Sequence, residues 1–530
     1  MRINRYRVVA AMLVLAAALG ANACTDVLVE PESTVSGANV FDDPESYRAF
    51  LAKLYAGLAV TGQQGPSGNN DIQGIDEGFG QYLRVYWKAQ VLPTEEAVIS
   101  WGDAGLPELI QLQWGSTNQF LNAMYYRAYY QIALVNEFLR ETTTEKLEAR
   151  GASAELQATV QQYRAEARWL RALSYWHVLD LFGNVPLVDE DFVIGSTPPE
   201  QATRADIFAF VEQELLDLSS DLPPVGAAEY ARADQGSAAM LLAKLYLNAE
   251  VYGVGARYSD AMSQAATVIG GPYQLDDDFQ DMFLADNHTS PEIVFAIPFD
   301  GDNTQTWGGT TFLVNAAIVG SMQGADYGTG EKWNGLRVTP EFVGLFEGGA
   351  TGPDARATIL YTSGQSLDIP DFTTPEAGYG YPKFQNLTEA GVAGSNSTHP
   401  DTDFPMFRLA DAYLIYAEAC LWAGGGACEA TALGYVNAIR QRAYGDNTGD
   451  ITAGELTLDF ILDERARELA WEAHRRTDLV RHGVFTTADR LWAWKGGTEG
   501  GQAVDAARNL FPIPANELLA NPNMEQNPGY

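Results

Sequence analysis

Apolar residues recur at intervals of three and four along much of this chain, which is the period of an amphipathic α-helix. In the segment 44–59 the apolar positions are Tyr47, Phe50, Leu51, Leu54 and Leu58. The same rhythm, with Gly and Pro at several boundaries, predicts further helices over 117–139, 155–182, 204–219, 233–249, 258–269, 407–422 and 429–442. We therefore expect a mainly α-helical protein.

Several of these helices come in pairs that are joined by short turns. The helix over 233–249 leads into the one over 258–269, and 407–422 leads into 429–442 across three consecutive glycines. Paired helices in series are typical of a TPR-like helical repeat, although no clean 34-residue period is visible. The predicted fold is mainly α, a TPR-like helical-repeat scaffold with long loop and small-sheet insertions.

The helical period fades between about residues 270 and 405. Gly, Asn, Asp and Thr dominate there, and short strand-like runs such as 292–299 appear. This segment is too long for a structureless connection in a compact domain. We predict an insertion of loops and small sheets on the helical scaffold, and we expect function to lie there more than in the helices.

The stretch 463–485 combines helical length with many charges. It contains no Gly or Pro before Gly483, so we predict one long helix. The charged residues that follow one another at intervals of four, and so share one helix face, are Glu464, Glu468, Glu472 and Arg476. Trp471 indicates that the stretch is buried. We expect a buried ladder of ion pairs, which specifies packing more than it adds stability.

Composition limits the classes of partner. The chain has 530 residues, of which 46% are hydrophobic and 19% charged, which suits a packed core. Its 33 basic and 69 acidic residues give a formal net charge of −36. This excess argues against nucleic acid as a partner, because such proteins need a basic footprint, and against electrostatic docking on anionic lipid. Since the acidic residues are spread along the chain, we interpret them as favouring solubility at an exposed surface.

The N-terminus has the form of an export signal. Arg2, Arg5 and Arg7 precede an apolar run over 8–19. That run is too short to span a bilayer, and no later apolar run is long enough to do so.

The sequence ANAC, which ends at Cys24, is similar to a lipoprotein processing site. We predict that residues 1–23 are a signal peptide and that Cys24 carries a lipid, which would be the membrane anchor. Residues 24–44 are polar and extended, as in a tether. The alternative is ordinary cleavage near Ala23, which would leave Cys24 as a free thiol.

The two remaining cysteines are Cys420 and Cys428. In an oxidising compartment they can pair across a helix–helix turn, and the alternative is two buried thiols. Two cysteines without suitably spaced histidines do not make a zinc site, so we predict no metal.

Catalytic signatures are weak. Glycoside hydrolysis needs two carboxylates across a cleft, and the candidates are Glu95–Glu96, the pair Asp401 and Asp403, and the carboxylates over 464–472. We interpret the last group as structural ion pairs, because these carboxylates share one helix face and have Arg neighbours. There is no G-x-S-x-G elbow and the five histidines are scattered, His177 having the surroundings of a core residue. We expect neither catalytic residues nor a cofactor.

Aromatic residues in loops are the stronger functional signal, because flat rings suit the apolar faces of sugars while Asn, Asp and Gln meet the hydroxyls. The expected ligand-binding residues are Trp87, Trp101, Trp307, Tyr327 and Trp333. The alternative for each ring is that it packs a loop onto the helices.

Two blocks of sequence carry a resemblance to a known family. The first is ER-x-x-EL-x-x-E over 464–472 with Arg475, Asp478–Leu479, Arg481 and Gly483, and the second is the ending PIP…QNPGY over 512–530. Together they resemble the signatures of the SusD/RagB family of surface-exposed, nutrient-binding lipoproteins. The resemblance implies a single SusD-like domain over 45–530.

The resemblance also implies a location and a partner. The protein would be anchored by lipid to the outer membrane, face outwards, and pass an oligosaccharide or polysaccharide to a SusC-like TonB-dependent transporter. This is binding without catalysis. The alternatives are a secreted carbohydrate-active hydrolase and a peptide-capturing member of the same family.

Overall fold

The computed structural model describes residues 41, 43–62, 65–66, 71–193, 195 and 197–530. The chain divides into the units Met1–Ser46 and Tyr47–Tyr530, and the second unit is described below. The expected signal peptide, Cys24 and almost all of the expected tether lie outside the described residues.

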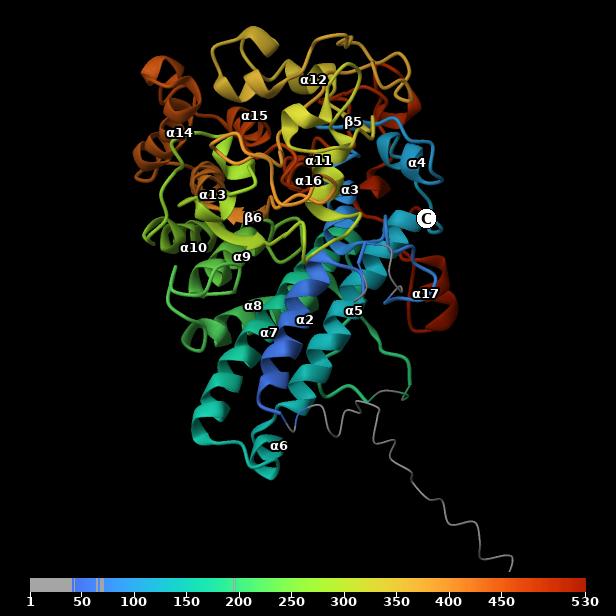
Figure 1. Cartoon of the computed structure of the whole chain (residues 1–530), viewed down its shortest axis with the longest axis vertical. Helices are drawn as coiled ribbons and strands as arrows, with labels where there is room; N and C mark the ends of the chain where they lie inside the picture. Colours follow the sequence, from blue (N-terminus) through green and yellow to red (C-terminus); the bar gives the residue numbers. More distant parts are fainter. Residues whose placement is uncertain (1–40, 42, 63–64, 67–70, 194, 196) are drawn as a thin grey trace, which may run out of the picture. The chain divides into compact units, whose positions relative to one another are not determined.

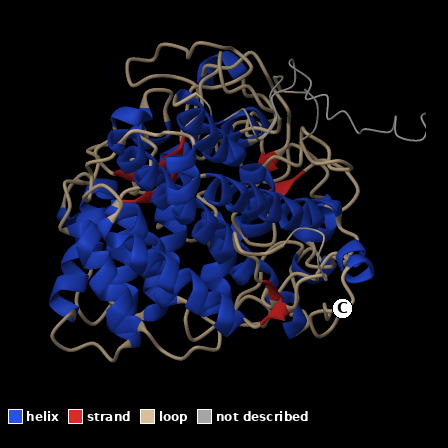
Figure 2. Ribbon diagram, turned by 90° about the horizontal axis from the view of Figure 1, so that it is seen from below, coloured by secondary structure: helices blue, strands red, loops and turns tan. Residues whose placement is uncertain are grey.

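Helices make up most of the regular structure of this unit (Figures 1 and 2). The α-helices are α2 (Glu45–Ala59), α3 (Tyr82–Val91), α4 (Leu106–Ile110), α5 (Gln119–Glu141), α6 (Thr144–Ala149), α7 (Ala154–Phe182), α8 (Arg204–Asp217), α9 (Gln235–Leu247), α10 (Tyr258–Ile269), α11 (Gly309–Ala316), α12 (Pro340–Val343), α13 (Leu409–Trp422), α14 (Glu429–Tyr444), α15 (Leu458–Leu469), α16 (Arg475–Arg481) and α17 (Ala515–Ala520). The strands are β1 (Val98–Ile99), β2 (Val185–Pro186), β3 (Gln201–Ala202), β4 (Ile293–Ile297), β5 (Leu336–Arg337) and β6 (Phe404–Arg408).

The helices predicted from periodicity are confirmed to within a few residues at each end. The longest is α7, where the Ser153 side chain accepts a hydrogen bond from the backbone N–H of Leu156 and so caps the first turn. The helix ends at Gly183, whose φ of 78° is accessible to glycine without steric cost.

The helices of the scaffold pack against one another in series. Helix α5 packs against α7 and α7 against α8, while α9 packs on α10, α10 on α13 and α13 on α14. Each helix thus buries its apolar face against its neighbours, as in a helical-repeat scaffold. The predicted mainly α-helical scaffold is confirmed.

The loop-rich insertion is anchored where β4 and β6 pair antiparallel, with Ile297 opposite Phe404. The chain between them leaves and returns at adjacent points, and it includes α11, α12 and β5 (yellow in Figure 1). The described strands form separate two-stranded pairs, visible as small red patches in Figure 2. Loops and small sheets on a helical scaffold are therefore what the structure contains.

The predicted single helix over 463–485 is wrong. Helix α15 ends at Leu469 and α16 begins at Arg475. Between them Trp471 and Ala473 have φ values of 64° and 63°, in the left-handed region that non-glycine residues seldom adopt. This break is held by Glu96, whose carboxylate accepts the N–H of Trp471 at 3.0 Å and whose carbonyl accepts Trp471 Nε1 at 2.9 Å.

The alternatives for the two cysteines are resolved in favour of pairing. A disulfide joins Cys420 near the end of α13 to Cys428 before α14, with Cα atoms 5.9 Å apart. Within the described part of the chain, no helix is both long and apolar enough to cross a membrane.

Candidate functional site

The charged residues of the 464–481 motif form a buried network that joins distant segments. Glu468 pairs with Arg408 at 2.6 Å and with Arg356 at 2.9 Å, and Glu464 pairs with Arg356 at 2.8 Å and Arg440 at 2.9 Å. Both glutamate side chains are 0% exposed. Burial alone would raise the pKa of Glu464, but Arg356 and the other arginines around it lower its pKa to about 2.

The expectation of a buried ion-pair ladder is confirmed, but its partners differ from those expected. Glu472 lies beyond the end of α15 and contacts Lys383 and Arg408, each at 2.6 Å. Arg476 contacts Asp180 at 3.4 Å instead of extending the row from Glu472. Because the network connects the insertion, β6 and α14 to α15, its role is to fix these segments relative to one another.

Neither carboxylate pair considered for hydrolysis faces an open cleft with its partner. Glu95 contacts Arg475, and Glu96 lies against Trp471 in the core. Burial raises the pKa of Glu96 to about 8, and nothing in the sequence around Glu96 indicates that it is buried. Its side chain is inaccessible to a substrate. Asp401 accepts the N–H groups of Gly301 and Ser395, and Asp403 accepts the N–H of Phe299, so both join neighbouring backbone segments.

Three of the five predicted ligand-binding residues lie in one row of rings. The ring centroids of Trp101 and Trp333 are 6.2 Å apart, and those of Trp333 and Trp307 are 6.0 Å apart. His399 lies 5.0 Å beyond Trp307, and Phe312 lies 5.9 Å from Trp101 at the other end. The three tryptophans, here called the tryptophan row, are each partly exposed.

A strand pairing places Trp101, at one end of this row, beside the central Trp333. Trp101 follows β1 and Trp333 precedes β5, and in the β1–β5 pair Ile99 lies opposite Leu336. Trp101 Nε1 then donates a hydrogen bond to the carbonyl of Trp333 at 3.1 Å. The pairing therefore fixes the spacing of two rings that are 232 residues apart in the sequence.

Polar groups that the sequence did not single out surround the row. Arg84 on α3 donates to the carbonyl of Trp307 at 2.7 Å, and its guanidinium lies 4.5 Å from the centre of the Phe312 ring. Burial lowers the pKa of Arg84 to about 10, which leaves it charged at neutral pH. Glu331 accepts from Trp333 Nε1 at 3.3 Å and from Thr398 Oγ1 at 3.1 Å. No sequence motif marks these residues, because their relation to the row depends on long-range packing.

Trp87 and Tyr327 lie elsewhere. The expectation that Trp87 occupies a loop is wrong, since it lies on α3, is 0% exposed and donates from Nε1 to the carbonyl of Trp471 at 2.8 Å. Tyr327 is partly exposed and packs on a separate small cluster of Ile318, Val319 and Met322.

The tryptophan row can bind an extended ligand through its apolar faces, while Glu331 offers an acceptor at its edge and the buried Arg84 holds the backbone of Trp307. Among the described residues, no group of three or more His, Cys, Asp or Glu side chains is placed to hold a metal ion. The arrangement suits binding of a ring-shaped, hydroxyl-bearing ligand.

Comparison with known proteins identifies the family. The chain is 32% identical to the starch-binding protein SusD of Bacteroides thetaiotaomicron over 571 aligned residues, which cover 98% of each chain. The chain belongs to the SusD family. The model of the SusD family matches residues 355–530, which include the buried ion-pair network and the C-terminal ending. The SusD-like protein P2 of Formosa agariphila is 26% identical over 80% of this chain and 83% of its own length.

Solved SusD-type structures share the fold. A SusD homologue from Bacteroides thetaiotaomicron superposes with a TM-score of 0.72 at 20% identity, covering 93% of this chain and 98% of its own. Surface glycan-binding protein A from the same organism, solved in complex with laminarihexaose, gives a TM-score of 0.69 at 20% identity and covers 91% and 99% of the two chains. These SusD relatives are named as binding proteins.

Proposed function

We propose that this protein captures a glycan on its tryptophan row. The observation that carries the proposal is the succession of Trp101, Trp333 and Trp307 at centroid distances of 6.2 and 6.0 Å, with neighbouring ring planes tilted by 51° and each ring partly exposed. Rings held in series offer successive apolar platforms to successive sugar units, so an oligosaccharide gains more than a monosaccharide. The names of the SusD relatives, starch-binding and glycan-binding, support this class of ligand.

The proposal includes a cellular role. Residues 1–23 act as a signal peptide, Cys24 carries the lipid, and residues 45–530 form a single SusD-like domain on the outer face of the outer membrane. A SusC-like TonB-dependent transporter receives the glycan. The protein binds without catalysis. The engagement of Glu95 by Arg475 and of Glu96 by the N–H of Trp471 favours this reading over a secreted hydrolase, because these two carboxylates do not face each other across a cleft.

Calorimetric titration with maltohexaose and laminarihexaose tests the binding site. Trp333→Ala is expected to weaken binding by about tenfold or more, as for a central aromatic contact worth ~1.4 kcal/mol or above. The matched control is Trp422→Ala, because Trp422 is also partly exposed but lies at the end of α13 against Tyr258. Equal affinities of both variants and the parent protein would reject the tryptophan row as the site.

Purification from membranes at native expression level tests the partnership. A TonB-dependent barrel that co-purifies in near-equal amount is the expected result, and recovery of the intact protein without one would contradict it. Incubation with the same hexasaccharides separates binding from hydrolysis, since we expect no shorter sugars to appear.

A further inference from the structure

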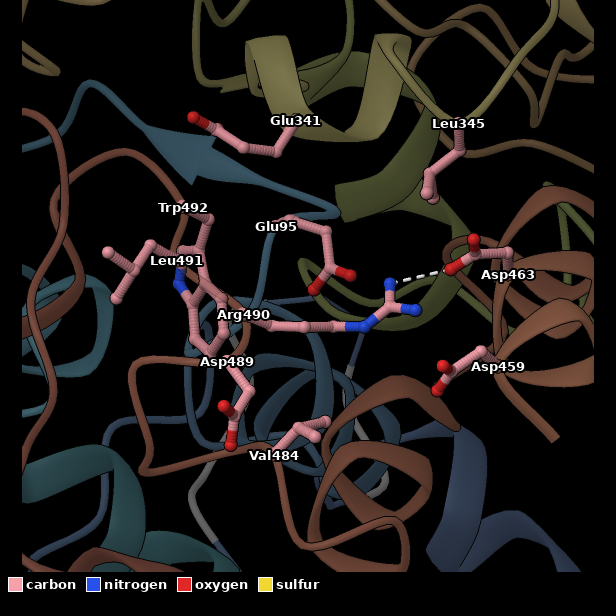
Figure 3. A pocket seen from close by; sticks show the side chains of 10 residues that line it. All are labelled: Glu95, Glu341, Leu345, Asp459, Asp463, Val484, Asp489, Arg490, Leu491 and Trp492. Carbon is pink, nitrogen blue, oxygen red and sulfur yellow. Dashed lines mark ion pairs between the residues drawn. The ribbon is translucent and has the colours of Figure 1, made fainter.

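A second candidate site lies away from the tryptophan row (Figure 3). It is a pocket of about 530 Å³, bounded by the segment before β1, α12, the first turns of α15 and the chain that follows α16. Its lining residues are Glu95, Glu341, Leu345, Asp459, Asp463, Val484, Asp489, Arg490, Leu491 and Trp492. None of the three tryptophans of the row contributes to it.

The pocket is strongly acidic. Five of its lining side chains are carboxylates and only Arg490 is basic. Arg490 extends across the pocket and its guanidinium contacts Asp463 at 2.6 Å (dashed in Figure 3). Two further cations lie close by, Arg475 against Glu95 and the buried Lys495, whose ammonium donates to backbone carbonyls. The carboxylates still outnumber the cations by five to three.

One carboxylate oxygen in the pocket lacks a partner. The Glu95 side chain is 5% exposed, and its Oε1 accepts from Arg475 Nε at 2.9 Å. Its Oε2 is buried without any hydrogen-bond partner in the described part of the chain. Figure 3 shows this carboxylate directed into the pocket beside Arg490. Burying a charged oxygen without a donor is unfavourable, so a donor supplied by a ligand would remove that cost.

The other carboxylates of the pocket each make few hydrogen bonds or ion pairs. Glu341 Oε2 accepts the N–H of Ala493 at 3.1 Å, and Asp489 accepts the hydroxyl of Thr487 at 2.9 Å. Asp463 Oδ1 is in ion-pair range of Arg490 but makes no hydrogen bond of acceptable geometry. Asp459 is exposed at the mouth, on the first turn of α15. The pocket thus retains acceptor capacity at its buried end and negative charge at its entrance.

The shape of the site favours an organic cation over a metal ion. No three carboxylates of the described chain converge as metal ligands, and the cavity is large enough for a molecule. We propose that this pocket binds a small organic cation bearing an ammonium or guanidinium group, which donates to Glu95 while Asp459 and Asp463 attract it. A cation of this kind donates hydrogen bonds to carboxylate oxygens, and Glu95, Asp459 and Asp463 line the same pocket.

Calorimetric titration of the purified protein with spermidine, and with glucosamine against glucose, tests the proposal. Glucosamine and glucose differ only in an amine at one ring position, so the proposal expects glucosamine to bind more tightly, and low ionic strength to strengthen binding of both amines. Asp459→Asn is expected to weaken spermidine binding by about twofold to fivefold, the range for a solvent-exposed ion pair. Arg490→Gln removes the only basic lining residue and is expected to strengthen it by a similar factor.

The matched control is Asp277→Asn, which makes the same change in net charge at an exposed loop position outside the pocket. If Asp277→Asn weakens binding as much as Asp459→Asn, the effect is one of overall charge and the pocket is rejected. Calcium binding that Asp459→Asn abolishes, without any amine binding, would also overturn the proposal. Trp333→Ala should leave spermidine binding unchanged, so loss of the glycan site and loss of the cation site are distinguishable.

Discussion

Arg408 on β6 contacts Glu468 at the end of α15 at 2.6 Å, and the two side chains are 1% and 0% exposed. The same guanidinium reaches Glu472 at 2.6 Å and Glu292 at 2.7 Å. One arginine thus links three buried carboxylates from two separate segments, and Arg356, Lys383 and Arg442 supply further positive charge to them. Since β6 is where the insertion returns to the scaffold, this cluster fixes the base of the segment that carries Trp307 and Trp333.

Glu468→Gln is expected to destabilise the protein by about 3–5 kcal/mol, because it leaves the arginines around position 468 buried with one fewer countercharge. Urea denaturation followed by tryptophan fluorescence measures the change. Glu200→Gln, at an exposed position, is the control and should stay within about 0.5 kcal/mol of the parent protein. Equal stabilities of the two variants would mean that the network contributes nothing to folding.

The helices were predictable because their signals are local. The period of α7, its Ser153 cap and its Gly183 ending all lie within the segment itself. The break at Trp471 was not predictable, because the group that stabilises it, Glu96, is 375 residues away in the sequence. No Gly or Pro marks the position.

The candidate site was predictable only in part, because some of its features are local in the sequence and others depend on long-range contacts. Residue type and loop position indicated Trp101, Trp307 and Trp333, but their alignment depends on the long-range β1–β5 pair. Trp87 was misplaced because every residue of α3 is buried, including Arg84 and Lys88, so the helix has no alternation of polar and apolar faces. The sequence pattern on which helix prediction relies is absent there.

Glu96 should make stability depend on pH. Burial raises its pKa from the ordinary value of 4.5 to about 8 in the folded state, so folding binds a proton between those values. Stability contributed by this group is therefore present below about pH 4.5 and is lost as the pH rises to 8, at up to ~1.4 kcal/mol per pH unit. Glu96→Gln retains an acceptor for the N–H of Trp471 but cannot ionise.

We expect the free energy of unfolding of Glu96→Gln, measured by urea denaturation, to rise relative to that of the parent protein as the pH is raised from 5 to 8. The control is again Glu200→Gln, whose difference from the parent protein should not change over this range. A constant difference between Glu96→Gln and the parent protein at pH 5, 6.5 and 8 would show that Glu96 is ionised throughout.

The Cys420–Cys428 disulfide closes a short loop between α13 and α14. Replacing both residues by Ser should lower the free energy of unfolding by about 2–3 kcal/mol, from the loop-entropy relation for eight residues. Reduction of the parent protein with dithiothreitol should give a similar loss in thermal denaturation, and the double variant should not respond to the reductant. A response of the double variant would assign the effect to something other than this bond.

Cys24→Ala tests the proposed lipid anchor. The variant should move from the membrane fraction to the soluble fraction of the envelope, because no other anchor is proposed and a lipid chain supplies ~0.8 kcal/mol per buried CH₂ group. Metabolic labelling with a palmitate analogue should mark the parent protein only. Membrane retention of the unlabelled variant would contradict the assignment.

Two substitutions of Trp101 should reduce glycan affinity to different degrees. Trp101→Ala removes both an apolar face and the hydrogen bond to the carbonyl of Trp333, so affinity for laminarihexaose or maltohexaose should fall by about tenfold or more. Trp101→Phe keeps a ring but loses the hydrogen bond, and we expect it to retain most of the affinity, within about fivefold of the parent protein. Calorimetry with each hexasaccharide measures both.

Tyr327→Ala separates the row from the wider set of loop aromatics, because Tyr327 packs on the cluster of Ile318, Val319 and Met322 and makes no ring contact with the tryptophans that the structure records. If the row is the binding surface, this variant should bind as the parent protein does. If Tyr327→Ala loses as much affinity as Trp101→Ala, the ligand extends beyond the row onto the neighbouring loop. If Trp101→Phe is as weak as Trp101→Ala, the hydrogen bond that orients the ring matters more than its apolar face.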